Sequence, residues 1–270
     1  MRSNIWIGIV MLLMMEGCAG QQEPEPVVQS EMEPLISGVA DSIYQQAQMP
    51  VRPPFGRWAE GASDSDFVLL ADVVPDVIQE IRYYTTFNFV GRRIPGYEAP
   101  VAILTRRAAD SLRAVSNELV AQGYRLKVFD AYRPQRAVMY FIGWARQSAD
   151  TLMRRYFYPR VPKDSLFVEG YLSIRSAHAR GSTVDLTLFD MQTEREVDMG
   201  GTYDMLDTLS QFTYRDGLTR EQLRHRLLLR EAMMRHGFKP VRTEWWHFQL
   251  RDEPYPSTSF DFVICGHNGP

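Results

Sequence analysis

Two short stretches of the chain contain side chains that are suited to bind one metal ion. The first, SAHARGSTVD, contains His178 and Asp185, and the second, EWWHF, contains Glu244 and His247. Two neutral imidazoles and one carboxylate form a three-ligand set for Zn²⁺, and a catalytic zinc keeps its fourth position open for water. The pattern predicts one zinc ion bound by His178, Asp185 and His247. Glu244 is then the natural base for an attacking water.

The spacing within EWWHF does not by itself bring Glu244 and His247 to one site. The aromatic segment EWWHFQL is predicted to be a strand, and successive side chains of a strand point to opposite faces. Residues three positions apart then face opposite sides. A shared site therefore requires a bulge, or a glutamate that lies just before the strand begins. In the first stretch, His178 and Asp185 can reach one site more easily, because Gly181 permits a turn between them.

The remaining histidines and the cysteines offer no competing site. His225 and His236 fall on a predicted helix among charged residues, where a surface position is favoured, and His267 lies in the terminal tail, where we expect it to be solvated. The chain has only two cysteines, Cys18 and Cys265. This excludes a disulfide scaffold and a cysteine-rich zinc site.

The composition is that of an ordinary globular protein. Of 270 residues, 45% are hydrophobic and 23% are charged, which is enough for a full core. The net charge of −3 gives no indication of nucleic-acid binding, and the short arginine clusters are expected on solvated faces. No internal linker is visible after residue 60, so residues 61–270 are predicted to form one domain.

The first 60 residues have the composition of an export signal and a tether. Arg2 precedes the apolar run Ile5–Met15, which is too short to span a bilayer but typical of a signal peptide. Gly17 before Cys18 resembles a bacterial lipoprotein signal, so residues 1–18 are predicted to be a signal peptide of this type, in which Cys18 is lipidated and becomes the new N-terminus; secretion without a lipid is the alternative. Residues 19–60 are rich in Gln, Glu and Pro and are predicted to form a tether. The protein is thus expected in the periplasm or cell envelope, with the lipid as its only contact with the membrane.

Hydrophobic periodicity predicts both helices and strands. Helices are expected over Thr105–Gln122, from Pro134 to about Ser148, and over Thr219–His236, and alternating strands over 124–128 and 184–188. The first of these strands leads to Asp130 and Arg133. Together these elements favour an α+β fold, with a small central, mostly antiparallel sheet flanked by helices. The aromatic and basic segment 149–170 is either a loop or lid near the site or an ordinary surface insertion.

Five blocks of the chain, in order, resemble the vancomycin-resistance type of D-alanyl-D-alanine dipeptidases. These blocks are IRYYTTFNFVGRRIPGY, FDAYRPQRAV, SAHARGSTVDLTLFD, VDMGGTYD and EWWHF. The third and fifth also match the S-x-H-x-x-G-x-x-x-D signature and its second half in zinc D,D-peptidases of the hedgehog-type fold. The resemblance covers residues 67–250 and implies that fold, one zinc per chain and hydrolysis of the dipeptide to two D-alanines.

The resemblance also implies a role for individual residues. It implies that His178, Asp185 and His247 bind the zinc and that Glu244 is the catalytic acid and base. Arg133, in the D-x-Y-R-P block, would stabilise the transition state. Ser176 would lie near the ammonium end of the substrate. Asp130, in the arginine block, would lie at the substrate site or orient Arg133.

Asp198 could support the site in a similar way, and a turn cap is the alternative interpretation for Asp130 and Asp198.

Two other functions are compatible with the same residues. Export favours a longer substrate, a peptidoglycan stem peptide cut by a D,D-carboxypeptidase. A non-catalytic, zinc-dependent wall-binding lipoprotein is the third possibility. The presence of Glu244 and Arg133 argues against it, because a binding protein needs no base beside its metal.

Overall fold

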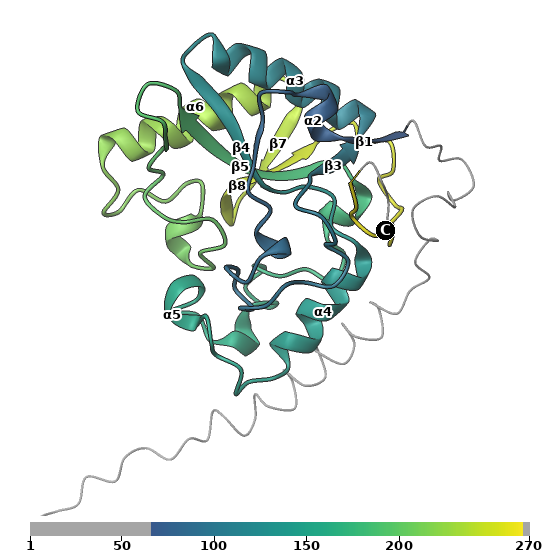
Figure 1. The fold of residues 1–270 in the computed structure, drawn as a ribbon. Coiled ribbons are helices and arrows are strands. Elements are labelled where there is room, and N and C mark those ends of the chain that lie inside the picture. Colours follow the sequence, from purple (N-terminus) through teal and green to yellow (C-terminus); the bar gives the residue numbers. More distant parts are fainter. Residues whose placement is uncertain (1–65, 267–270) are drawn as a thin grey trace, which may run out of the picture. The chain divides into compact units, whose positions relative to one another are not determined.

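The computed structural model describes residues 66–266, and its core is a six-stranded sheet (Figure 1). The predicted signal peptide, Cys18, the tether and His267 lie outside the described residues. The sheet order is β2-β4-β5-β8-β7, and β6 pairs with β5 beside this path. The strands are β2 (Ile78–Gln79), β4 (Tyr124–Asp130), β5 (Thr183–Asp190), β6 (Arg195–Glu196), β7 (Phe238–Val241) and β8 (Glu244–Leu250). All pairs are antiparallel except β2 with β4, which confirms the predicted α+β fold.

Strand β5 lies at the centre of the sheet and contributes to both faces of the core. It pairs with β4 on one side and β8 on the other. Val184, Leu186 and Leu188 are fully buried, and so is the Thr187 side chain of the opposite face. The alternation read from the sequence is therefore correct. Asp185 belongs to the second face, which is the face that carries the polar site.

Two long helices, α3 (Arg106–Val120) and α6 (Arg220–Arg235), cover one face of the sheet (Figure 1). Both begin at the predicted position, and a threonine caps each: Thr105 accepts a hydrogen bond from Ala108 N, and Thr219 forms a reciprocal capping box with Gln222. Gly123 follows α3 with a φ of 87°, which glycine adopts without strain. These caps fix where both helices start.

The opposite face of the sheet is covered by shorter elements. They are α4 (Gln135–Ala145), α5 (Arg154–Phe157) and the 3₁₀ turns η2 (Arg82–Tyr84), η3 (Lys163–Ser165), η4 (Ala177–Arg180) and η5 (Thr208–Ser210). Beside them, β1 (Phe67–Leu69) and β3 (Ile103–Thr105) form a two-stranded sheet, and α2 (Leu70–Val73) follows β1. Helix α4 starts after Pro134 as predicted, but it ends at Ala145 instead of Ser148. Pro134 supplies the extended entry to α4, with φ −56° and ψ 145°.

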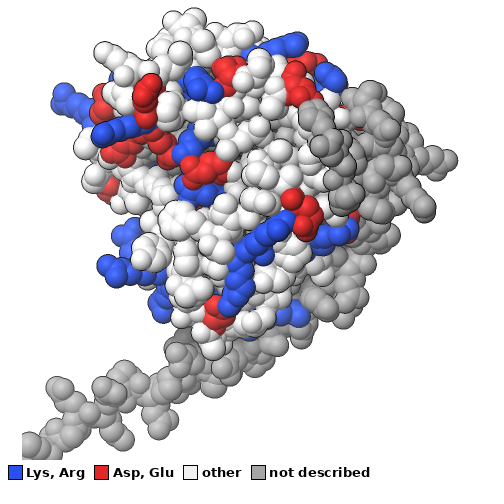
Figure 2. Space-filling model, viewed as in Figure 1, with Lys and Arg blue, Asp and Glu red and all other residues white. Residues whose placement is uncertain are grey.

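The surface carries charges of both signs. On the face shown in Figure 2, acidic and basic side chains are interspersed rather than separated by sign. Within residues 66–266 no helix has the length and apolar character needed to cross a bilayer. The polar groups that matter for chemistry are instead concentrated inside the molecule, on the helix-poor face of the sheet.

Candidate active site

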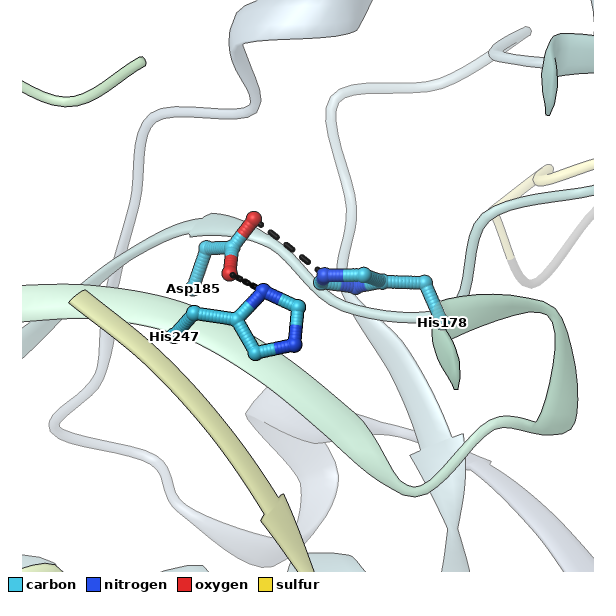
Figure 3. Close-up of side chains that lie close together, drawn as sticks. All are labelled: His178, Asp185 and His247. Carbon is cyan, nitrogen blue, oxygen red and sulfur yellow. Dashed lines mark ion pairs between the residues drawn. The ribbon is translucent and has the colours of Figure 1, made fainter. Parts of the chain in front are cut away.

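Three predicted ligands come together from three separate elements (Figure 3). His178 lies on η4, Asp185 on β5 and His247 on β8, and one potential ligand atom from each lies within 4.8 Å of the others. Asp185 and His247 are directly paired across β5 and β8. The sheet register therefore joins two of the ligands, and the turn at Gly181 returns the chain so that His178 faces them.

A bulge in the β7–β8 hairpin solves the problem of Glu244 and His247. Pro240 pairs with Phe248, but its neighbour Val241 pairs with Glu244, so extra residues of β8 are accommodated between these pairs. The local irregularity turns both side chains to one pocket, and Glu244 Oε2 lies 3.1 Å from His247 Nδ1. Of the two arrangements that would allow a shared site, the structure therefore adopts the bulge.

The environment of His178 orients its ring as a metal ligand requires. The ring is completely buried, and Nδ1 lies 2.6 Å from the Ala131 carbonyl oxygen. A carbonyl oxygen only accepts, so Nδ1 carries the proton and Nε2 presents its lone pair. Nε2 points to Asp185 Oδ2 at 3.3 Å. Such a hydrogen bond behind the ring is the usual support of a histidine ligand.

The donor atoms at the centre fit a divalent cation. His178 Nε2 and Asp185 Oδ1 are buried and have no hydrogen-bond partner among the described residues. Burial alone would raise the pKa of Asp185, but the two imidazoles outweigh it and hold that pKa below its ordinary value. For His247 burial is again outweighed, and Asp185 with Glu244 raises its pKa to about 10. The carboxylates therefore favour positive charge at this point, which a divalent cation would supply.

Arg133 is held rigidly at the edge of the ligand group. Its Nε and Nη2 both lie 2.9 Å from Asp130 Oδ2, and Nη2 lies 3.6 Å from Asp185 Oδ2. The guanidinium also lies over the rings of Tyr83 and Phe141, at 5.0 and 5.4 Å. These contacts fix a charged donor beside the ligands while leaving it in the wall of the pocket.

Asp130 supports Arg133 from behind. Its side chain is fully buried, it accepts a hydrogen bond from Tyr97 Oη at 2.7 Å, and it is not part of the pocket wall. Of its two expected roles, the geometry favours orienting Arg133 over contacting a substrate. Ser176, by contrast, lies in the pocket wall directly before η4.

The pocket beside the ligands has a volume of about 210 Å³. Aromatic side chains from several elements enclose it, among them Tyr83, Phe89, Phe141, Phe167 and Tyr171. Phe167 and Gly170 belong to the segment 149–170, so this segment contributes to the site and is more than a surface insertion. The pocket thus combines the charged groups at the ligands with apolar walls, the usual character of a small-molecule site.

Asp204 is a pocket residue that the sequence reasoning did not single out. It lies in the block VDMGGTYD, has a φ of 60° and receives a hydrogen bond from Tyr83 Oη at 3.0 Å. Burial raises its pKa well above the ordinary value, and the nearby Asp185 raises it further. A left-handed backbone at an aspartate is uncommon and occurs preferentially at functional sites. The sequence holds no comparable signal, because the conformation is not visible there.

The other polar residues considered from the sequence lie elsewhere. His225 lies on α6 beside Glu221, and His236 caps the same helix and contacts Glu118. His225 therefore lies on α6 and His236 at its end, which confirms the predicted helix. Asp198 accepts hydrogen bonds from Gly200 N and from the Gln222 side chain. It is therefore a turn cap, the second of its two interpretations.

Sequence comparison places this geometry among known proteins. The family profile described as D-ala-D-ala dipeptidase, peptidase M15, matches residues 63–265. The D-alanyl-D-alanine dipeptidase of Enterococcus faecalis is 38% identical over 74% of this chain and 99% of its own length. Those of Enterococcus faecium and Streptomyces coelicolor are 37% and 36% identical, over 73% and 74% of this chain and 98% of their own length.

Proposed function

The chain belongs to the peptidase M15 family of D-ala-D-ala dipeptidases, and from this premise we propose that it hydrolyses D-alanyl-D-alanine to two D-alanines with one zinc ion. The observation that carries the proposal is the meeting of His178, Asp185 and His247 in one pocket with Glu244 and Arg133. His178 Nε2, a carboxylate oxygen of Asp185 and a ring nitrogen of His247 would hold the metal. When bound, zinc lowers the pKa of water and polarises a carbonyl oxygen.

Glu244 is placed to move the proton that the reaction requires. Its carboxylate lies in the pocket wall beside His247. During attack of water on the peptide carbonyl, it accepts one proton of that water. As the C–N bond breaks, it donates this proton to the leaving amine, so that the carboxylate is regenerated.

Arg133 is placed to stabilise the negative charge that develops on the carbonyl oxygen. The guanidinium stays charged at all relevant pH values, and its contacts with Asp130, Tyr83 and Phe141 hold it in place before substrate arrives. A donor fixed in advance loses no free energy to reorganisation, and one such donor contributes on the order of 3–4 kcal/mol to transition-state stabilisation.

The ammonium end of the dipeptide has a complementary group in the pocket. Asp204 offers carboxyl oxygens for the substrate ammonium, whose positive charge would favour the ionised form, and Ser176 lies in the same wall with a hydroxyl. The enclosure by Phe167 and Tyr171 limits the volume to about 210 Å³. A pocket of this size favours a free dipeptide over a stem peptide.

Hydrolysis of a substrate panel tests the proposal. The zinc-loaded chain is incubated with D-Ala-D-Ala, L-Ala-L-Ala and a muropeptide ending in D-Ala-D-Ala, and released alanine is quantified. We expect rapid hydrolysis of D-Ala-D-Ala alone. Faster release from the muropeptide would assign a D,D-carboxypeptidase, and no release from any substrate would assign a binding protein.

For the cell, we propose that the chain is exported and anchored by a lipid on Cys18. The supporting pattern is Arg2, the apolar run Ile5–Met15 and Gly17 before Cys18. Expression in a bacterium followed by fractionation and mass spectrometry tests it. The wild-type chain should be found in the membrane fraction and carry an acylated N-terminal cysteine. Cys18→Ser should abolish both the acylation and the association with the membrane fraction. A soluble wild-type chain in the periplasm would show secretion without a lipid.

A further inference from the structure

A second pocket lies on the other side of the β7–β8 hairpin from the candidate active site. Trp245 and Phe248 line this pocket, whereas Glu244 and His247 line the first. Its remaining walls come from helix α6 and from the loop that contains Phe212, and we call it the α6 pocket (Figure 1 shows α6). Its volume is about 250 Å³, compared with about 210 Å³ for the active-site pocket. A ligand of about dipeptide size therefore fits.

The α6 pocket is strongly basic. Guanidinium groups come from Arg215, Arg220, Arg224, Arg226 and Arg230, and no carboxylate of residues 66–266 lines it. Arg224 pairs with Glu221 outside the pocket. Within the described part of the chain, the other four form no ion pair. Burial, and after it the neighbouring Arg215, lowers the pKa of Arg226 to about 10.

Two residues of the pocket wall each contain a buried donor atom that has no acceptor among the described residues. Arg226 and Trp245 are 6% and 4% exposed, and among the described residues neither Arg226 Nη2 nor Trp245 Nε1 forms a hydrogen bond. The other nitrogens of Arg226 do find acceptors, since Nε donates to Met199 O and Nη1 to Leu209 O. Both atoms are shielded from solvent, so they belong to the packed base of the pocket, and the accessible cations of its rim are those of the other arginines.

The remaining lining is apolar. Phe212, Leu223, Leu227, Pro240, Trp245 and Phe248 form it, and the Arg230 guanidinium lies 5.4 Å from the centre of the Phe212 ring. Leu227 is 41% exposed although it is a large aliphatic residue. The pocket therefore presents an apolar surface with cations around it.

We propose that the α6 pocket binds a small phosphate monoester that carries an apolar substituent. Several unpaired guanidiniums favour a ligand with more than one negative charge, and a phosphate monoester carries about −1.5 to −2 at pH 7. The guanidinium fork matches phosphate oxygens in a bidentate manner. The apolar substituent contacts the ring of Trp245 and the Leu227 side chain. This site is separate from the proposed peptidase function and does not depend on it.

Phenyl phosphate is a direct probe of the α6 pocket. Its binding to the zinc-loaded full chain is measured by titration calorimetry, alongside inorganic phosphate, benzoate and benzyl alcohol. We expect phenyl phosphate to bind most tightly, because only this probe has both the dianion and the ring. Equal or tighter binding of benzoate or benzyl alcohol would overturn the assigned ligand class.

Paired variants locate the binding. Arg220→Ala with Arg230→Ala should weaken phenyl phosphate binding by at least about tenfold, since a hydrogen bond to a charged group exceeds that factor. Arg195→Ala, which removes an exposed arginine on β6, should change it less than about twofold. Binding that survives the double variant but is lost in His178→Ala would place phenyl phosphate at the metal ligands and overturn the proposal.

Leu227→Glu provides a test that does not depend on removing arginines. Because Leu227 is half exposed, the substitution leaves the core intact. The new carboxylate lies three residues from Arg224 and from Arg230 on the same helix, where opposite charges attract. We expect a higher midpoint of thermal unfolding and loss of phenyl phosphate binding. Unchanged binding in this variant would also contradict the proposal.

Discussion

Glu244 lies 3.1 Å from His247 and in the wall of the pocket, the position that its proposed role as proton carrier requires. Glu244→Gln keeps the shape but cannot accept a proton. We expect kcat for D-Ala-D-Ala to fall by about 10²–10⁴, the usual contribution of general acid–base catalysis. The control is Glu231→Gln on the outer surface of α6. Bound zinc, measured by atomic absorption, should stay at one ion per chain in both variants; wild-type activity in Glu244→Gln would refute the assigned role.

Tyr203 supports the ligand group from the second face of the sheet. Its hydroxyl donates to Asp185 Oδ2 at 3.1 Å, and its ring stacks on Phe129 at a centroid distance of 4.7 Å. Tyr203→Phe removes the hydrogen bond and keeps the stacking. We expect zinc affinity, measured by competition with a chelator, to fall about 10–100-fold, as is usual when a partner of a metal ligand is lost. Unchanged affinity would mean that Asp185 needs no support from Tyr203.

At the scale of elements, Gly181 couples the small β1–β3 sheet to the turn that returns His178 to the site. Its φ is 77°, and a Cβ at this position would lie 2.3 Å from Phe67 Cε1 on β1. Gly123 has a similar φ of 87°, but a Cβ there would meet open space. An alanine at either position would suffer backbone strain, but only an alanine at Gly181 would also overlap a neighbouring side chain.

We therefore expect Gly181→Ala to destabilise the protein more than Gly123→Ala, by about 1–3 kcal/mol, the usual cost of overpacking. Urea denaturation of both variants measures the difference in the free energy of unfolding. Zinc binding should weaken only in Gly181→Ala, because only this turn positions His178. Equal destabilisation would show that Phe67 moves aside freely.

At the scale of the whole molecule, the three ligands lie on separate elements, so a bound metal should stabilise the fold as a whole. At a zinc concentration 1,000 times Kd the gain is about 4 kcal/mol. For a domain of this size it corresponds to an increase in Tm of about 8–16 °C. Thermal unfolding with EDTA and after zinc is restored measures this change. The change should vanish in His178→Ala and persist in His225→Ala; the same Tm with and without zinc would contradict the site.

Predictions from local pattern were the most successful. The periodicity of apolar residues located α3, β4, β5 and α6, and in the structure a threonine caps the start of each of the two helices. These signals are local, because a cap or an alternation depends on residues within one turn or strand. The predicted C-terminus of α4 was too late, because no glycine follows the helix to give a local signal for its end.

The sequence by itself determined the types of the ligands and their order along the chain: His178 and Asp185 flank a glycine, and Glu244 precedes His247. The tertiary structure decided how they meet. The bulge of β8 turns Glu244 toward His247, the β5–β8 register pairs Asp185 with His247, and the backbone of Asp204 turns its carboxylate into the pocket. Register and bulges depend on pairing between distant strands, and such pairing has no signature within either strand alone.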